Sequence, residues 1–266
     1  MTKRSTESKL NARHRQILEL AKQQGFLTTE TLARTFDVTT QTIRRDINML
    51  CDDGLLRRFH GGAGPASSVE NVDYSSRQVL NHEAKIRIAK AVVEQIPDNA
   101  SLFINIGTTT EEVAKALEGH RNLRIITNNL NVAMMLCDNE DFEVIVAGGV
   151  VRNDRGVIGE STIDFIRQFK VDYGIIGISG IDSDGTLLDF DYREVRVAQA
   201  IIENSRQVFL ASDHTKFSVT PMVKLGTLAD IDALFTDAPP PKAILDVIAE
   251  TKTRLIVASE TGNPNH

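Results

Sequence analysis

Cysteine and long apolar runs are both scarce in this chain of 266 residues. Its two cysteines, Cys51 and Cys137, give neither a disulfide framework nor a metal-ligand cluster. No apolar run approaches the ~20 residues that a membrane-spanning helix needs. The polar start, MTKRSTESKLNARHR, lacks the apolar core of a signal peptide. We therefore expect a cytoplasmic protein without a membrane segment, a metal ion or another cofactor.

The motifs of several nucleotide-, calcium- and metal-dependent protein classes are also missing. Gly174, Gly177 and Gly180 do not follow the dinucleotide fingerprint, and no phosphate-binding loop ends in Gly-Lys-Ser/Thr. The aspartates before Gly185 lack the spacing and the late glutamate of a calcium loop. None of the six histidines has metal-ligand spacing, so we assign no catalytic or metal-binding residue.

Charge is distributed unevenly along the chain, whose formal net charge is −6. Residues 1 to 65 carry 11 Lys and Arg against 7 Asp and Glu, whereas the remainder carries 19 against 29. A small basic part joined to a larger acidic part suggests a polyanion-binding module attached to a second domain. Chance scatter of surface charge would give the same difference, so charge alone does not decide.

The segment DVTTQTIRRDINML, residues 37 to 50, combines an apolar stripe with a polar opposite face. At about 100° per residue, Ile43, Ile47 and Leu50 share one narrow face of a helix. The far face carries long amide and guanidinium side chains, those of Gln41, Arg44, Arg45 and Asn48. Thr39 or Thr40 can cap the first turn.

Two further helices are predicted upstream, over ARHRQILELAKQQG and over TTETLARTF, which begins at a threonine cap. A tight link joins the second of these to the 39–50 helix, which is the order of a helix-turn-helix. In that motif Gln reads adenine edges and Arg reads guanine edges in the major groove. The alternative is a solvated charged face on an ordinary surface helix.

The next segment, DDGLLRRFHGGAGP, is compatible with a two-stranded wing. A wing there would present basic side chains to the DNA backbone, whereas the alternative is that the Gly61-Gly62 pair starts a flexible linker. We predict a winged helix-turn-helix domain over residues 1–63. Its expected DNA contacts are Thr39, Thr40, Gln41, Thr42, Arg44, Arg45, Asn48, Arg57, Arg58 and His60.

The rest of the chain predicts a linker and then a larger α/β domain. Residues 64–77 are rich in Ser, Gly and Asn and read as the linker. From residue 78 to 258, short apolar runs alternate with helical patterns, which favours a largely parallel sheet with helices on both faces. Residues 259–266 are expected to be a tail.

Ligands of such sheets bind beyond the carboxyl ends of the strands. In INIGTTTEE, backbone amides and threonine hydroxyls at a helix start suit a phosphate or carboxylate, although an ordinary threonine cap is the alternative. Packing alone could require the glycines of AGG at 147–149. A group of acids at 182–194, and Lys216 after a later strand, are further candidates, although a lone surface lysine is the simpler interpretation of Lys216.

These motifs resemble those of a known family. The run TTQTIRRDINML followed by GLLRRFHGGA resembles the N-terminal signature of DeoR-type bacterial transcriptional repressors. The order IGTTTEEVA, TNNLNVA, AGG, IGISGIDSDGTLLDFDYREVR and DHTKF is similar to their effector half. The resemblance implies an inducer-binding domain related in fold to sugar-phosphate isomerases. It departs at Asn105, where the family usually has an acid.

The resemblance implies a repressor that binds double-stranded operator DNA. We expect a dimer or tetramer built through the α/β domain, because one three-helix module buries little DNA surface and specific affinity usually needs two half-sites. The resemblance also implies release by a small phosphorylated polyol or sugar, foremost glycerol 3-phosphate, and control of glycerol or carbohydrate catabolic genes. The expected effector contacts are Gly107, Thr108, Thr109, Thr110, Asn128, Gly148, Gly149, Asp191, Glu194 and Lys216. The rivals are a sugar-phosphate isomerase-like enzyme, which would not need the basic winged domain, and an activator with the same DNA contacts.

Overall fold

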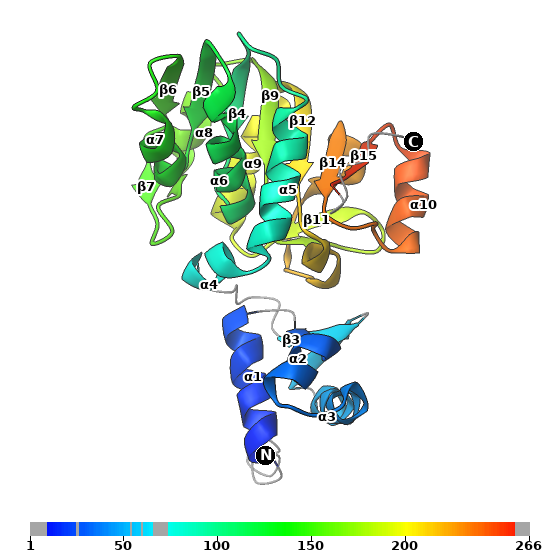
Figure 1. Cartoon of the computed structure of the whole chain (residues 1–266). Helices are drawn as coiled ribbons and strands as arrows, with labels where there is room; N and C mark the ends of the chain where they lie inside the picture. The colour runs from blue at the N-terminus through cyan, green and yellow to red at the C-terminus, as the bar shows by residue number, and fades with distance from the viewer. Residues whose placement is uncertain (1–9, 25–26, 54, 60, 66–73, 259–266) are drawn as a thin grey trace. The chain divides into compact units, whose positions relative to one another are not determined.

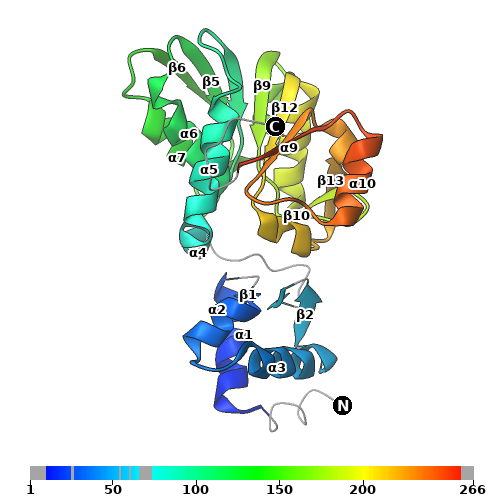
Figure 2. The same cartoon turned by 45° about the vertical axis from the view of Figure 1, so that its right-hand side comes forward.

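The computed structural model describes residues 10–24, 27–53, 55–59, 61–65 and 74–258. The chain separates into two compact units on either side of the bond between Leu80 and Asn81. Figures 1 and 2 label the helices and strands of both. Among the helices of the described ranges, none is both long and apolar enough to cross a membrane.

The first unit contains the three predicted helices and an antiparallel hairpin. Its helices are α1 (Ala12–Gln24), α2 (Thr29–Thr35), α3 (Thr40–Asp52) and α4 (Tyr74–Val79). Its strands are β1 (Leu27–Thr28), β2 (Leu56–Phe59) and β3 (Gly62–Pro65), and β3 lies between the other two. This order confirms the predicted winged helix-turn-helix.

The core of this unit forms where the helical periodicity placed it. Ile43, Ile47 and Leu50 are at most 2% exposed and pack with residues of α1 and α2. Thr39 caps α3, since its hydroxyl accepts a hydrogen bond from the amide of Thr42. The buried stripe therefore fixes which side of α3 faces solvent.

A buried acid also joins α3 to α1. Asp46 is 7% exposed and accepts a hydrogen bond of 2.7 Å from Arg13 Nε. Its other carboxylate oxygen lies 3.0 Å from Nε2 of the buried His14. Burial alone would raise the pKa of Asp46, but these two partners outweigh it and hold the pKa below its usual range.

The second unit is built on one sheet of seven parallel strands. In spatial order these are β15 (Arg254–Val257), β14 (Ala233–Thr236), β12 (Ser205–Ala211), β9 (Val171–Ile176), β4 (Ser101–Ile104), β5 (Leu123–Thr127) and β6 (Phe142–Val146). All seven correspond to apolar runs predicted as strands.

Helices cover both faces of this sheet (Figures 1 and 2). One layer holds α5 (His82–Val93), α6 (Thr108–Ala116) and α7 (Leu130–Leu136), and the other holds α8 (Glu160–Ile166), α9 (Tyr192–Glu203) and α10 (Lys242–Glu250). Strand alternation divides the core between them: Leu102 and Ile104 pack into the first layer and Phe103 into the second. The predicted α/β architecture is confirmed.

Several short elements were not predicted. A hairpin joins β7 (Val150–Val151) to β8 (Val157–Ile158), and a small antiparallel sheet contains β10 (Gly180–Ile181), β11 (Thr186–Asp189) and β13 (Val223–Thr227). Three short 3-10 helices are η2 (Leu117–Gly119), η3 (His214–Ser218) and η4 (Leu228–Asp230). Three of these strands have only two residues, which is too few to form a recognisable pattern in the sequence.

The expected linker is shorter than predicted at both ends. Strand β3 extends through Pro65, because the backbones of Gly62 and Gly64 pair with neighbouring strands and need no apolar side chain to do so. Helix α4 begins at Tyr74. Residues 66–73, and the expected tail at 259–266, lie outside the described residues.

We predict that Asp46→Ala will destabilise the first unit by about 1.5–3 kcal/mol, because it leaves Arg13 and the buried His14 without their acceptor. Native-state hydrogen exchange of the α3 amides measures this free energy for the unit alone. Because the folded-state pKa of Asp46 is depressed, the stabilisation is present at pH 7 and is lost as pH falls through that pKa. Asp52→Ala, at an exposed acid of the same helix, is the control, and equal protection in both variants would contradict the assignment.

Candidate nucleic-acid interface and ligand site

The exposed face of α3 carries the predicted base-reading residues. Gln41, Arg44, Arg45 and Asn48 are all exposed and lie at helical spacings of three and four residues, so they adjoin one another. Thr40 is exposed beside them, and the hydroxyls of Thr39 and Thr42 hydrogen-bond to each other at 2.9 Å. Thr39 and Thr42 therefore stabilise the first turn of α3, and the amide and guanidinium groups of the other residues point to solvent.

The wing is a hairpin whose turn is held by hydrogen bonds to Thr29. Gly61 has φ 81°, a conformation that favours glycine, and its carbonyl accepts hydrogen bonds from the amide and the hydroxyl of Thr29. The alternative of a flexible linker starting at Gly61 is therefore wrong.

Arg57 and Arg58 of the wing are both exposed, but they are successive strand residues and point to opposite faces. Arg58 is close enough to Cys51 to oppose electrostatically the rise in thiol pKa that burial causes. The two guanidinium groups therefore lie on opposite faces of the wing, and their contact with the DNA backbone stays a prediction. His60 lies outside the described residues.

The loop between β4 and α6 is closed by Thr110. Its hydroxyl lies 2.8 Å from the carbonyl oxygens of both Asn105 and Gly107 and can donate its proton to either. Gly107 has φ 152°, and a Cβ there would lie 3.2 Å from Thr110 Oγ1. Thr110 therefore holds the loop in shape. Thr108 and Thr109 are largely buried at the start of α6, and their hydroxyls have no hydrogen-bond partner among the described residues.

A buried acid that the sequence analysis overlooked fixes this loop to the next one. Glu111 is 3% exposed and accepts hydrogen bonds from Asn129 Nδ2 at 3.0 Å and Asn131 Nδ2 at 2.9 Å. Asn128, predicted to contact the effector, donates from Nδ2 to the carbonyl of Val157. Its Oδ1 is buried without a partner in the described part of the chain, so an acceptor is available there.

The glycines after β6 have different roles. A Cβ on Gly149 would lie 2.2 Å from Thr162 Oγ1, so packing accounts for this glycine. A Cβ on Gly148 would meet nothing within 4 Å, and its carbonyl accepts a hydrogen bond from Thr162. Of the two, only Gly148 lies in open space.

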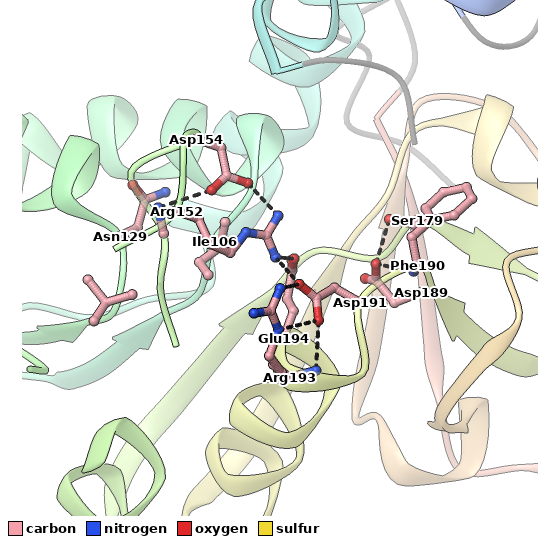
Figure 3. A network of polar contacts seen from close by, with 12 residues as sticks. Ile106, Asn129, Arg152, Asp154, Ser179, Asp189, Phe190, Asp191, Arg193 and Glu194 are labelled. Carbon is pink, nitrogen blue, oxygen red and sulfur yellow. Dashed lines mark hydrogen bonds and ion pairs between the residues drawn. The ribbon is translucent and has the colours of Figure 1, made fainter. Parts of the chain in front are cut away.

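Arg152, which the sequence analysis missed, connects the β7–β8 hairpin to α9 (Figure 3). Its guanidinium donates to Glu194 at 2.6 Å, to Asp154 at 2.7 Å and to Asp191 at 3.2 Å. Burial would lower the pKa of Arg152, but the three carboxylates outweigh it and the pKa is raised. Asp191 also caps α9 and pairs with Arg193, which lowers the pKa of that carboxyl group.

The acids at 182–194 do not form one cluster. Asp182 and Asp184 accept hydrogen bonds from backbone amides within the tight turn between β10 and β11. Asp189 accepts from the hydroxyl of Ser179 and from the Phe190 amide. Only Asp191 and Glu194 meet, on Arg152.

Lys216 lies on η3, which the buried Asp213 caps at its N-terminus. Burial would raise the pKa of Asp213, but the charges of Lys216 and the buried Lys85, with hydrogen bonds from Thr215, keep it below the usual range. Hydrogen bonding to Asp237 raises the pKa of His214. Lys216 of the loop after β12 and Lys85 of α5 therefore both compensate the charge of one buried acid.

The order of the strands brings these loops together at the carboxyl-terminal end of the sheet, which is called the ligand edge below. Strand β9 lies between β4 and β12, and neighbouring strands are about 4.8 Å apart, so the ends of β4 and β12 are about 10 Å apart. The β7–β8 hairpin reaches the same edge, since a Cβ on Gly156 would lie 2.5 Å from Ile106 Cδ1. A polar hollow of about 480 Å³ at the opposite edge contains none of the predicted ligand residues.

Comparisons with known proteins agree with the separation of the chain into two units. Residues 13–69 match the family model described as the DeoR-like helix-turn-helix domain, and residues 80–238 match the DeoR C terminal sensor domain. The chain is 54% identical to the glycerol-3-phosphate regulon repressor of Escherichia coli (strain K12), over 93% of this chain and 98% of that protein.

Two further relatives also align over almost their whole length. The glycerol-3-phosphate regulon repressor of Haemophilus influenzae is 51% identical, over 94% of this chain and 98% of that protein. The HTH-type transcriptional repressor CsqR of E. coli is 43% identical, over 96% and 98%. A ribose 5-phosphate isomerase of Methanocaldococcus jannaschii gives a TM-score of 0.39 at 13% identity, over 51% of this chain and 54% of that one, a likeness too slight to bear on function. The chain belongs to the DeoR family of DNA-binding transcriptional repressors.

Proposed function

We propose that this protein represses genes of glycerol or carbohydrate catabolism in the cytoplasm and that glycerol 3-phosphate releases it from its operator. The observation that carries the inducer assignment is the start of α6, where backbone amides and the Thr108 and Thr109 hydroxyls face no partner in the described residues. Such a helix start binds phosphate, and Lys216 at the ligand edge supplies a compensating charge. The names of two near relatives support the same ligand class.

The hydroxyl end of the ligand has acceptors within reach of this edge. The carboxylates of Asp191 and Glu194, and the partnerless Oδ1 of Asn128, can each accept a hydrogen bond from a polyol hydroxyl. The hairpin that carries Arg152 contacts Ile106 beside the phosphate loop. This arrangement favours a small molecule with a phosphate at one end and hydroxyls at the other.

The rival isomerase function lacks a base at the position of the family's usual acid. Asn105 is an amide whose Oδ1 already accepts from the Ile106 amide at 2.7 Å, and an amide does not take up protons at neutral pH. The three relatives reported above align over more than nine tenths of the chain and are all named repressors, which favours repression over activation.

We also propose that the protein is a homo-oligomer, because one helix-turn-helix module reaches only one half-site of a two-fold operator. A candidate contact is the β6 edge patch, which we define as Met134, Met135, Val146, Val150 and Val151. All five are exposed, and β6 is an edge strand paired on one side only. Residues 144–151 carry no charge, and the exposed Glu143 near the start of β6 is paired with Arg124, so the apolar part of the strand can meet a second copy without like-charge repulsion.

Base reading is tested by substituting Gln41 and Arg57. Gln41→Ala should relax base preference, because a bidentate base contact is worth about 1–3 kcal/mol of discrimination. Arg57→Ala should weaken binding to all sequences alike and reduce the salt slope by about one. Binding is measured by anisotropy on operator and scrambled DNA over a salt series, with Arg121→Ala in the other unit as the charge-matched control. Loss of affinity in Gln41→Ala with unchanged specificity would remove Gln41 from base reading.

The inducer site is tested by release curves. Thr109→Ala and Lys216→Ala should bind operator normally yet need more glycerol 3-phosphate for release. For Lys216→Ala the increase should be roughly tenfold or more, since a charge-assisted hydrogen bond is worth about 1.5–3 kcal/mol. Lys224→Ala, at an exposed lysine of β13, is the control. Wild-type release curves from both site variants would exclude this loop and lysine from the inducer site.

The β6 edge patch is tested with two exposed methionines. Met134→Glu places a charge in the patch, whereas Met222→Glu places the same charge on a side chain of similar exposure, 65% against 71%, elsewhere in the unit. Light scattering at micromolar concentration should show a smaller assembly for Met134→Glu alone. An unchanged mass for Met134→Glu, or a monomeric wild type, would contradict this interface.

A further inference from the structure

The junction between the two units contains two helices separated by two residues, Leu80 and Asn81, of which Asn81 has an unusual conformation. Helix α4 ends at Val79, and α5 begins at His82. Residues 74–93 contain neither Gly nor Pro, so nothing in their composition requires the interruption. The break coincides with Asn81, whose φ of 53° and ψ of 34° place it in the left-handed region. In the ordinary helical region this residue would join α4 and α5 into one helix.

A long-range hydrogen bond accounts for that conformation. Asn81 Nδ2 donates to Asp213 Oδ1 at 3.0 Å, across 132 positions of the chain. Asp213 is 2% exposed and belongs to the same short turn as Lys216, whose amide donates to the Asp213 carbonyl at 3.0 Å. The carboxylate that holds the helix break is therefore rigidly linked to the lysine proposed to bind the inducer phosphate.

The two sides of the break belong to different units. Helix α4 contacts α1 in the DNA-binding unit, whereas α5 packs on the sheet of the effector unit. Any change in the direction of α4 relative to α5 must therefore change the path of the chain between the units. Leu80 and Asn81 lie between the two helices, and of these two only Asn81 is left-handed.

We propose that Asn81 is the positioning residue that couples the inducer site to the DNA-binding unit. The inference rests on the proposed inducer site at Lys216. In the operator-binding state, the bond to Asp213 holds Asn81 left-handed and keeps α4 and α5 apart. When a phosphate binds Lys216, the attraction displaces η3 together with Asp213. The hydrogen bond between Asn81 and Asp213 is then lost. Asn81 then relaxes to the helical region, α4 and α5 join, and the operator is released.

The sign of this coupling gives it a distinctive test. Ala removes the amide and favours the helical region, so Asn81→Ala should mimic the induced state in the full-length protein. Its operator affinity without inducer should fall about tenfold, the order expected for a hydrogen bond to a charged group. Its affinity for glycerol 3-phosphate should rise, because the state that the inducer prefers is already favoured. General damage to the fold would not strengthen inducer binding.

The matched control is Asn99→Ala. Asn99 is also left-handed, with φ 64°, but it lies at the opposite edge of the sheet. Operator binding is measured by anisotropy without inducer, and inducer binding by calorimetry without DNA. Weaker operator binding with tighter inducer binding in Asn81→Ala, and neither in Asn99→Ala, is the expected result. Unchanged operator affinity, or inducer affinity that is unchanged or lower, would overturn the proposal. Failure of wild-type protein to bind glycerol 3-phosphate would instead refute the inducer assignment, and the operator measurement would still test the role of Asn81.

Discussion

Parallel pairing of all seven strands of the central sheet is the constraint on which the effector unit depends. Because every strand runs in the same direction, the loops after β4, β5, β6, β9 and β12 meet at one edge. Residues far apart in sequence thereby become neighbours, as Glu111 does with Asn129 and Asn131. The two buried faces of the sheet stabilise the unit. The loops at the carboxyl-terminal end of the sheet carry polar groups whose hydrogen-bond partners lie in other loops. A ligand at this edge can therefore influence several loops at once.

The DNA-binding unit is small and depends on fewer contacts. Its apolar core comes from three helices and the base of the wing, and the ion pair at Asp46 ties α1 to the helix that carries Gln41 and Arg44. That helix can read bases only while its buried stripe holds it in one rotation. The buried stripe and the proposed base-reading residues therefore lie on opposite faces of the same helix.

Helical periodicity was sufficient to predict the faces of α3, and short apolar runs were sufficient to predict the seven strands, because burial leaves both patterns in the sequence. It could not reveal Asp46 or Glu111, since an acid in a helix is ordinarily read as solvated. Arg152 binds carboxylates that lie 39 and 42 positions away in the sequence, and no local sequence pattern predicts such long-range contacts. Gly62 and Gly64 were assigned to a turn or linker because strand pairing through backbone leaves no side-chain signal. Asp182 and Asp184 were grouped with acids that the β10–β11 turn separates from them.

The central claim is that ligand and operator prefer different states of one protein. Thermodynamic linkage then requires that each lowers the affinity for the other by the same factor, typically 5- to 150-fold, or about 1–3 kcal/mol. The direct measurement is the affinity for glycerol 3-phosphate by calorimetry, with and without saturating operator DNA, set beside the operator affinity with and without saturating ligand. The account predicts equal ratios well above one. Ligand binding that is the same with and without operator would contradict it.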